Sequence, residues 1–393
     1  MSEEQEQERK WVVSPGPHIK GPKSIDKVMM LVIIALLPAT AAGVYYFGAY
    51  VLFVLGVSIL TALVTEMLIK RLRKRPFHMD GSAILTGLLL ALILPPRIPL
   101  WTVVIGSAFA IAIAKEAFGG LGHNIFNPAL AGRAFLATSF TGLMTRWVMP
   151  VDSMTADAVT CATPLSESFA GEINSELYRE MLLGNIGGSI GETSALLLIA
   201  GGLFLVAIKI VNWRIPFIYI GTVFLLAFAI GEDPVFHILA GGLMLGAFFM
   251  ATDYVTAPLT NTGKAVFAAG CGVLTVSIRL YGGMPEGVAF SILIMNAFTP
   301  LIDGHFIPTP LGYKKPEKED KKEEKKPEPK KEEEKKEDKK PEPKKEDKKP
   351  EPKEEEKNPE EKKEDKKGED NIEANKPEKE EPEQKESIKE GSK

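Results

Sequence analysis

The stretch from residue 28 to residue 75 reads VMMLVIIALLPATAAGVYYFGAYVLFVLGVSILTALVTEMLIKRLRKR, and it determines the fold class. Two apolar runs of about twenty residues follow one another, and each is long enough to cross a hydrocarbon core about 30 Å thick as a helix. The basic hexapeptide KRLRKR at 70–75 ends the second run. The chain is therefore predicted to be an integral membrane protein built from α-helices.

Further apolar runs predict a polytopic, all-α membrane protein with about ten transmembrane helices. The predicted spans are residues 28–47, 50–69, 82–95, 100–116, 128–148, 193–210, 215–231, 235–251, 264–281 and 287–303. Lys and Arg in short loops stay on the cytoplasmic side of a membrane. The dense basic loop at 70–75 therefore places the amino terminus in the cytoplasm, and an even number of spans returns the carboxyl terminus there. The loop at 149–190 is then predicted to face outward.

The two halves of the chain resemble each other at a constant offset of 163 residues. The matches are Pro95 with Pro258, Gly119-Gly120 with Gly282-Gly283, and Ala134-Phe135 with Ala297-Phe298. Since each half holds an odd number of predicted spans, the two five-helix repeats are inverted, and a functional axis lies near the bilayer midplane. The predicted divisions are an amino-terminal segment at 1–25, a first repeat at 26–148, the outer loop at 149–190 and a second repeat at 191–308.

The carboxyl-terminal segment has a different composition from the rest. Residues 314–393 hold 28 Lys and 31 Asp or Glu, which is 59 of the 98 charged residues in the chain. Such a segment buries too little apolar surface to offset the entropy of ordering it. It is predicted to be a disordered cytoplasmic tail, either a solvated extension without a site or an arm that docks partners.

The outer loop contains DAVTCATPL at 157–165, which is small, extended-prone and free of aromatic residues. Pro164 disfavours the helical region for the residue before it, so Thr163 is predicted to be extended with its hydroxyl presented. The small side chains of Cys161 and Ala162 leave room for another protein to approach. A Thr-Pro turn with no further role is the structural alternative.

A second motif, GGLGHNIFNPALAGRAF at 119–135, predicts a helix start. Asn127 can cap a helix whose first position is Pro128. The free N–H groups of that helix, with Arg133 one turn on, would suit an anion or the polar edge of a ring. A helix start without a ligand explains the motif equally well.

A third motif, GGSIGETSALLL at 187–198, has the spacing of a capping box. Ser189 and Glu192 are predicted to begin the sixth span at the outer surface. Ser189, Thr193 and free N–H groups there could hold a phosphate, whereas the charge of Glu192 would repel one. Capping alone is again the alternative.

Four carboxylates lie in or at the edge of predicted spans: Glu66, Glu116, Asp253 and Asp303. Ionised groups at membrane depth are costly and usually functional. Asp253 is the one most expected to be buried, which favours an ion path there, with Glu116 and Asp303 as further candidates. Near span ends, Glu66, Glu116 and Asp303 can instead reach the surface. The two cysteines and five histidines show no metal-ligand spacing, so no metal site and no catalytic residue is predicted.

Together these motifs resemble one family. DAVTCAT at 157–163 resembles the signature Asp-x-x-Ser/Thr-Gly-Ala-Thr, to which a flavin transferase attaches FMN. The two glycine-rich motifs, together with MATDYVTAP at 250–258, are similar to blocks of the family that contains the D subunit of the Rnf electron-transport complex and the B subunit of the sodium-pumping NADH:quinone reductase. The resemblance covers residues 20–308 and implies inverted five-helix repeats like those of urea transporters.

The resemblance implies roles for single residues and partners. Thr163 matches the threonine that bears FMN through a phosphoester, Asp157 matches the signature acid, and Thr160 and Ala162 fall within the signature. Cys161 departs from the family, which usually has glycine there. A second, non-covalent flavin is also implied, without residues assigned to it. The expected partners are the A, B, C, E and G subunits of an Rnf complex, a flavin transferase, and Na⁺ or H⁺, with no nucleic acid.

The function expected from the resemblance is that of a translocase subunit, not catalytic alone, in a prokaryotic cell membrane. It would relay electrons through FMN and couple ferredoxin and NAD electron transfer to ion translocation. One alternative is a channel or transporter for a small solute, without a redox role. Another is an assembly scaffold whose charged tail recruits partners.

Overall fold

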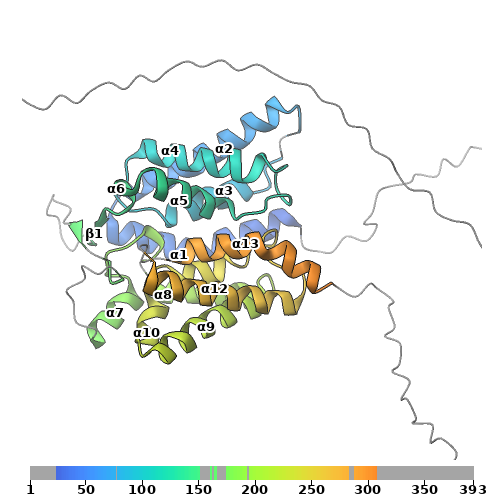
Figure 1. The fold of residues 1–393 in the computed structure, drawn as a ribbon. Coiled ribbons are helices and arrows are strands. Elements are labelled where there is room, and N and C mark those ends of the chain that lie inside the picture. Colours follow the sequence, from blue (N-terminus) through green and yellow to red (C-terminus); the bar gives the residue numbers. More distant parts are fainter. Residues whose placement is uncertain are drawn as a thin grey trace, which may run out of the picture. The chain divides into compact units, whose positions relative to one another are not determined.

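The computed structural model describes residues 24–307 except 77, 151–159, 162, 166–173, 193 and 283–286. The described part is mostly helical, apart from one pair of two-residue strands (Figure 1). The elements are α1 Ile25–Phe47, α2 Tyr50–Leu72, α3 Ser82–Leu92, α4 Leu100–Phe109, η1 Ala110–Glu116, α5 Pro128–Ser139, α6 Thr141–Met144, β1 Trp147–Val148, β2 Thr160–Cys161, α7 Ser175–Leu183, η2 Ile190–Glu192, α8 Ala195–Ala207, α9 Arg214–Ile230, α10 Pro234–Leu239, α11 Leu243–Leu245, η3 Gly246–Met250, α12 Asn261–Tyr281 and α13 Val288–His305. The predicted tail at 314–393 lies outside the described residues.

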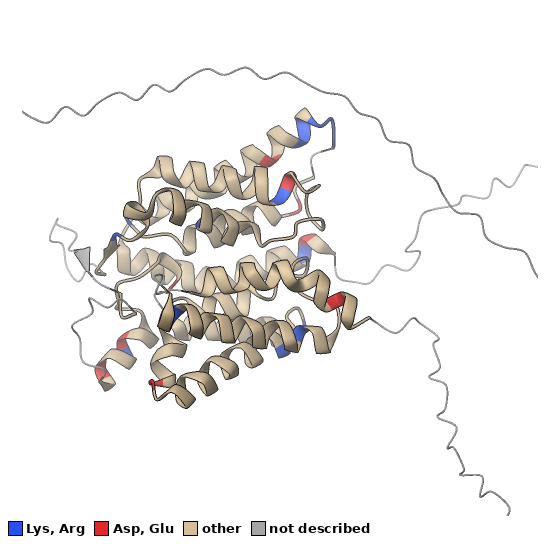
Figure 2. Cartoon of the chain, viewed as in Figure 1, with Lys and Arg blue, Asp and Glu red and all other residues tan. Residues whose placement is uncertain are grey.

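The described helices make this a polytopic membrane protein. α1, α2, α12 and α13 are each long and apolar enough to cross a bilayer, and α3, α8 and α9 are apolar but shorter. Many large apolar side chains on these helices point outward, among them Phe53, Leu60 and Phe228. Lys, Arg, Asp and Glu gather mainly near helix ends (Figure 2). An apolar outer surface of this kind is suited to lipid or to partner helices.

The first two predicted spans are confirmed as helices, and their ends have local causes. Ser24 caps α1, since its side chain accepts a hydrogen bond from the N–H of Lys27 at 3.3 Å. Lys70 and Arg71 occupy the last turn of α2, where positive charge complements the negative end of the helix dipole. The basic stretch at 70–75 therefore also favours the end of the second helix.

Two predicted spans are more broken than expected. The span at 128–148 is helical as α5 only to Ser139, and the short α6 and the strand β1 follow it. The span at 235–251 is divided into α10, α11 and the π-helical segment η3. Gly241 and Gly242 separate α10 from α11 with φ of +68° and +67°, a left-handed conformation that glycine adopts without steric cost. Hydropathy alone does not register such breaks.

Where α3 and η3 end, backbone carbonyls accept hydrogen bonds from side chains of other helices. Beyond α3, Ile93 O accepts a hydrogen bond from Arg133 Nη1 of α5 at 2.6 Å. Beyond η3, Thr256 O accepts one from Thr299 Oγ1 of α13 at 3.0 Å. Backbone groups at membrane depth need partners of this kind because no water is present to replace them. The helix breaks are thus stable parts of the fold.

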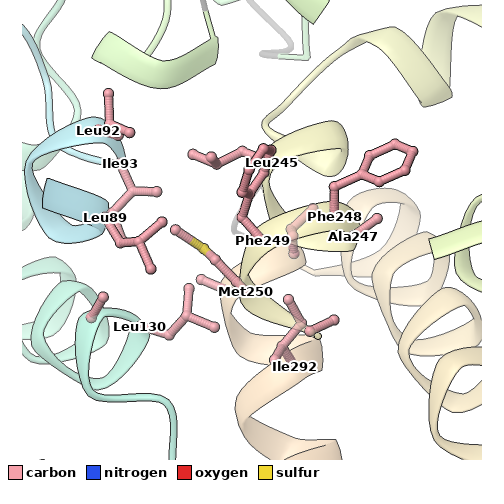
Figure 3. Packing of buried hydrophobic residues seen from close by; sticks show 14 of the residues in the cluster. Leu89, Leu92, Ile93, Leu130, Leu245, Ala247, Phe248, Phe249, Met250 and Ile292 are labelled. Carbon is pink, nitrogen blue, oxygen red and sulfur yellow. The ribbon is translucent and has the colours of Figure 1, made fainter. Parts of the chain in front are cut away.

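Apolar side chains from both halves of the chain meet where α3 and η3 end. Figure 3 shows Leu89, Leu92 and Ile93 beside Leu130 of α5, with Met250 and Phe249 reaching toward them from η3. Their burial is nearly complete. This contact, which we call the apolar plug, fills the space between the halves with hydrocarbon.

The crossing of α1 and α8 depends on glycine, which gives a stability prediction. A Cβ on Gly201 would lie 2.4 Å from the backbone oxygen of Ala35. Backbone cannot yield as a flexible side chain can, so Gly201→Ala forces the helices apart. Overpacking of this kind costs about 1–3 kcal/mol. We expect a lower thermal unfolding temperature of the detergent-purified protein.

Gly221→Ala is the matched control. Gly221 also lies inside an apolar helix, α9, but no atom stands within 4 Å of its added Cβ. Alanine in a helix interior is more stable than glycine by roughly 0.5–1 kcal/mol. An unfolding temperature for Gly201→Ala equal to that of Gly221→Ala would show that the crossing of α1 and α8 is not close.

Candidate functional site

Thr163 follows the strand pair, at the end of the helical body where Figure 1 also places α7 and α10. β2 pairs antiparallel with β1, with Val148 opposite Thr160. The sequence predicts a presented hydroxyl, yet Thr163 is only 6% exposed. The extended, proline-followed position alone does not decide exposure, because the next residues anchor the segment to the body.

Leu165 provides that anchor. It packs against an apolar cluster from α7, α10 and the segments after them, formed by Leu177, Met181, Ile186, Phe236 and Ala240. A Cβ on Gly241 would lie only 2.1 Å from Leu165 Cδ1. The glycine therefore forms the notch that receives Leu165. Thr163, two residues earlier, is held close to the helices as a result.

Several predicted cofactor residues cannot be placed in the same way. Asp157, Ala162 and Thr193 lie outside the described residues, and Thr160 is described through the backbone pairing of β2. Their roles stay predictions.

The predicted helix start at Asn127 is confirmed. Asn127 Oδ1 accepts hydrogen bonds from the N–H groups of Ala129 and Leu130 at 3.1 and 3.4 Å, and Pro128 is the first residue of α5. The groups predicted to receive an anion have internal partners, since Asn127 caps these N–H groups and Arg133 donates to Ile93 O. In this structure Asn127 caps the start of α5, and Arg133 supports the break after α3.

The predicted capping box at 189–192 begins a different element. Ser189 N donates to Glu192 Oε2 at 3.3 Å, but the residues enclose only the short 3₁₀ turn η2. The cap of α8 is Ser194, whose Oγ accepts from Leu197 N at 3.4 Å. The prediction that Ser189 and Glu192 begin the sixth span is wrong, because the chain turns once more before the helix begins.

Glu192 instead belongs to a buried group of charges. Its negative charge acts on Arg133 of α5 and on Arg279 of α12. Glu192 and Arg133 line a small cavity together with Gly241 and Gly242. A Cβ on Gly242 would lie 2.8 Å from Glu192 Oε1. The carboxylate thus partly compensates two guanidinium groups beneath the turn on which Leu165 rests.

Arg279 holds that turn in place, and it was not predicted from the sequence. Its Nη1 donates to His237 O at 2.5 Å and its Nη2 to Ala240 O at 2.8 Å. Its Nε is buried without a hydrogen-bond partner among the described residues. The sequence signal that could have identified it is a single arginine in the last turn of an apolar helix. A buried arginine has five N–H donors and therefore needs several acceptors nearby.

A larger cavity lies between the two halves of the chain. It contains about 740 Å³ of empty space, which includes its open mouth, and Lys115, Ser82, Asn124, Asn127 and Asp253 contribute to its wall. Asn124 Oδ1 is buried and has no hydrogen-bond partner within the described ranges. A concave site with a few converging polar groups, one of them unsatisfied, is typical of a ligand pocket.

Asn124 was not predicted from the sequence either. The available signal is its spacing of three residues from Asn127, in NIFN at 124–127. Asn127 Nδ2 reaches across to Met250 O at 3.2 Å, so the two asparagines stand where the first half meets η3.

The carboxylates predicted at span edges are not alike. Glu66 and Glu116 are 2% and 1% exposed, so neither reaches the surface as expected. Lys115, itself 1% exposed, explains the burial of Glu66 because its Nζ lies 2.9 Å from Glu66 Oε1. Lys70 adds a second cation at 2.7 Å from the same oxygen. Arg73 donates to the backbone oxygen of Glu116.

The other two carboxylates have local contacts, and the prediction that Asp253 is the most buried of the four is wrong: its side chain is half-buried, because it lies in the loop after η3 and not within a helix. Asp253 Oδ2 accepts from Thr256 Oγ1 at 3.2 Å, and its residue contributes to the cavity wall. Asp303 Oδ1 accepts from Leu259 N at 3.0 Å and ties the end of α13 to the loop before α12. Asp253 and Lys115 therefore share one cavity, whereas Asp303 supports a loop.

The contact between α7 and α10 predicts a pH effect near Thr163. Tyr178 of α7 donates a hydrogen bond to Asp233. This bond lowers the pKa of Asp233 below 3.8, and the N–H groups at the start of α10 add to the effect, while burial opposes it. A carboxyl with a lowered pKa stabilises the contact above about pH 4, and this is lost as the pH falls through the lowered pKa. We expect Tyr178→Phe to move acid loosening of α7 to higher pH.

Hydrogen exchange of the α7 amides, compared between variant and wild type at each pH, checks this expectation. Tyr281→Phe is the control, since Tyr281 is 83% exposed. The same acid profile for Tyr178→Phe and wild type would show that the Tyr178–Asp233 bond does not hold α7.

Comparison with known proteins agrees with the motifs. Residues 12–312 match the model of the NQR2, RnfD, RnfE family. The chain is 49% identical over 331 residues to the D subunit of the "proton-translocating ferredoxin:NAD(+) oxidoreductase complex" of Clostridium ljungdahlii, covering 79% of this chain and 99% of that protein. It is 48% identical over 298 residues to the D subunit of the "Na(+)-translocating ferredoxin:NAD(+) oxidoreductase complex" of Acetobacterium woodii, covering 74% and 92%.

A more distant relative extends the same match. The D subunit of the "ion-translocating oxidoreductase complex" of Stutzerimonas stutzeri is 41% identical over 318 residues, which is 71% of this chain and 90% of that protein. The family model covers most of the chain, including every described helix. With Thr163, Asn127 and Asp253 in their motifs, the chain belongs to the NQR2, RnfD, RnfE family.

Proposed function

We propose that this chain is the D subunit of an Rnf-type complex, which couples electron transfer between ferredoxin and NAD⁺ to the translocation of Na⁺ or H⁺. Relatives that it matches over 92–99% of their length carry that name. It acts as a translocase subunit, not catalytic alone, together with subunits of the A, B, C, E and G types. The two relatives have nearly equal identity and are named for different ions, so identity selects neither ion.

The observation that carries the proposal is the match to these D subunits, and we assign the flavin attachment to Thr163. A flavin transferase would join FMN to Thr163 Oγ1 as a phosphoester, with Asp157 as the acid of the recognition signature. When bound, FMN supplies one-electron redox chemistry. The strand pair before Thr163 and the Leu165 anchor after it fix the attachment point relative to the helices. Because Thr163 is 6% exposed, attachment precedes docking of Leu165 or requires its release.

Polar groups buried around Glu192, beneath the turn that receives Leu165, suit a phosphoester. Arg279 Nε and Ser189 Oγ are buried without a hydrogen-bond partner among the described residues. Arg279 holds the turn that receives Leu165, and its charge, with that of Arg133, exceeds the single charge of Glu192. A buried site with more positive than negative charge favours an anion. The same residues would orient the FMN phosphate.

The groups that line the cavity between the halves suit a flavin ring. A flavin ring is planar, with hydrogen-bond donors and acceptors along one edge. Asn124 Oδ1 is the unpaired acceptor among the described residues of the wall, and Lys115 supplies a donor on the same wall. The side chains of Leu85, Leu89 and Phe249 give the cavity apolar surface for the ring. We assign the non-covalent flavin to this cavity.

The solute-channel alternative conflicts with the apolar plug. A solute path through inverted repeats would run between the halves at the broken segments. There, Leu92, Met250 and Phe249 are almost completely buried against the opposite half (Figure 3). Arg133 and Thr299 also occupy the carbonyls that broken helices offer to ions. Such packing blocks the passage of ions and solutes between the halves in this state. It leaves room for one flavin on each side, at Thr163 and in the cavity.

The membrane arrangement follows from the same offset of 163 residues. Ile93 and Thr256, whose carbonyls each accept a hydrogen bond from a side chain of a later helix, are separated by that offset. We therefore assign a first repeat to 26–148 and an inverted second repeat to 191–308. The basic end of α2 is assigned to the cytoplasm with both termini, segment 1–25 and tail 314–393, of a prokaryotic cell membrane. The loop at 149–190 then lies outside, where the transferase acts.

Acid precipitation of the purified complex tests the proposal against a bare channel. We expect yellow colour to remain with the precipitated D subunit, because a phosphoester survives denaturation. A second flavin should appear in the supernatant. A colourless D subunit after separation from the other subunits would contradict the covalent flavin.

A further inference from the structure

We propose that Lys115, Ser82 and Asp80 form a proton relay between the cavity and the protein surface near the basic end of α2. The inference rests on the proposed function, in which the cavity holds the non-covalent flavin. It concerns how protons reach or leave that flavin, which the family match does not address.

The relay is a continuous chain of hydrogen bonds. Lys115 Nζ donates to Ser82 Oγ at 2.6 Å, and Ser82 Oγ donates to Asp80 Oδ1 at 2.5 Å. Lys115 and Ser82 both contribute to the cavity wall, while Asp80 is partly exposed in the loop before α3. Distances this short are typical of bonds to charged groups. These hydrogen bonds therefore connect the cavity to the surface through the side chains of Lys115, Ser82 and Asp80.

The turn at the start of α3 explains only part of this arrangement. Ser82 N donates to Asp80 Oδ1 at 2.9 Å, as in many turns that precede a helix. A turn does not require a buried lysine on the serine hydroxyl. Asn124 lines the same cavity as Lys115. Its Oδ1 is buried without a hydrogen-bond partner among the described residues, which indicates that a polar group binds there. The relay thus ends where a ligand is expected.

Several charged groups surround Lys115. Glu66 of α2 lies 2.9 Å from its Nζ, and Asp253 faces the same cavity from the loop after η3. Lys70 of α2 partly offsets Glu66 at 2.7 Å. Arg73 pairs with the neighbouring Glu116, with 3.9 Å between the charged atoms. Glu66 is thus the carboxylate paired with Lys115, and Asp253 is a further carboxylate on the cavity wall.

The proton step balances without an electron. The Lys115 ammonium gives a proton to Ser82 Oγ while Ser82 gives its own hydroxyl proton to the Asp80 carboxylate, which leaves a neutral amine and a carboxylic acid. Burial raises the pKa of Asp80, but the bonds from Ser82 and the charge of Lys115 outweigh it and lower the pKa. The acid formed on Asp80 therefore releases its proton to water. Rotation of the Ser82 hydroxyl allows the reverse direction.

The apolar plug closes one side of the cavity, so protons must enter or leave on the other side. Flavin reduction at neutral pH is accompanied by proton uptake, and oxidation by release. Leu89 and Phe249 belong both to the plug and to the cavity wall, so hydrocarbon closes the side toward the plug. Side chains that pass protons typically accelerate such a step about 10²–10⁴-fold.

The test follows proton uptake with a pH dye while reduced methyl viologen, a one-electron donor whose oxidation releases no protons, reduces the flavins of the purified complex. In Ser82→Ala, we expect the share of uptake that belongs to the cavity flavin to slow roughly 100-fold. Ser82→Thr keeps a hydroxyl and should stay near the wild-type rate. Thr86→Val is the matched control on the same helix, because the Thr86 hydroxyl donates to Ser82 O at 2.9 Å and lies outside the relay. Since Thr86 also lines the cavity, the acid-extractable flavin is measured in this variant too.

Asp80→Asn separates proton transfer from a structural role. We expect slow uptake that added formate restores, because a small weak acid can replace the missing carboxyl, whereas a structural defect would not respond. Wild-type uptake in Ser82→Ala, with the acid-extractable flavin retained, would overturn the relay and leave the proposed function intact. Absence of extractable flavin from the wild-type D subunit would overturn the cavity assignment and the relay together.

Discussion

A complex that carries Thr163→Ala is expected to show no flavin fluorescence in the D-subunit band of a denaturing gel. The phosphoester requires the Thr163 oxygen, and alanine offers no nucleophile in its place. Electron transfer from ferredoxin to NAD⁺ should fall to background in the same preparation, because an FMN without this covalent bond is free to dissociate. Fluorescence under ultraviolet light, compared with protein stain in the same lane, measures the effect.

Two variants make this result specific. Thr145→Ala removes a threonine that precedes β1, and its hydroxyl bonds only to the helical carbonyl of Thr141 among the contacts described, so fluorescence should be unchanged. Thr163→Ser restores a hydroxyl at the same point and should recover part of the signal. Undiminished fluorescence in Thr163→Ala would mean that Thr163 is not the attachment point of a covalent flavin.

The largest loss of stability is expected from Arg133→Leu. The substitution leaves Ile93 O without its partner at the end of α3 and removes a positive charge beside Glu192. Breaking a buried charged pair from one side typically costs about 3–5 kcal/mol. For a domain of this size, the unfolding temperature in detergent should fall by on the order of 10 °C. Differential scanning fluorimetry of the purified protein measures it.

Arg97→Leu is the matched control, since Arg97 is an exposed arginine close to the same helix break. Surface substitutions of this kind usually change stability by less than about 0.5 kcal/mol. Arg133→Lys keeps the charge but not the planar fork, and an intermediate loss is expected. Equal unfolding temperatures for the leucine variants of Arg133 and Arg97 would mean that Arg133 does not support the break.

Features that local chemistry determines could be predicted from the sequence. The length and composition of α1 and α2 follow from continuous apolar runs, and Asn127 before Pro128 is a helix start whose cap needs no distant residue. The offset of 163 residues also separates Ile93 from Thr256, whose carbonyls each accept a hydrogen bond from a side chain of a later helix. These features depend on neighbours in the chain or on repeated patterns, so a single sequence contains them.

Other features depend on contacts that no local pattern encodes. Leu165 anchors the segment of Thr163 only because Gly241 leaves a notch for it. Glu66 is buried because Lys115, 49 residues later, meets it at 2.9 Å. The same reason explains the wrong prediction at Ser189, where one additional turn fits between the glycines and α8. Burial and ion pairing across helices are decided by tertiary packing, which overrides local propensity.

Peptide mass spectrometry over residues 147–179 of the purified native complex is the decisive experiment for a flavin joined to Thr163. We predict that the peptide containing Thr163 carries an addition of the mass of FMN less one water, and that fragmentation assigns this addition to Thr163. A peptide of unmodified mass, from a complex that is active in electron transfer, would contradict the covalent attachment.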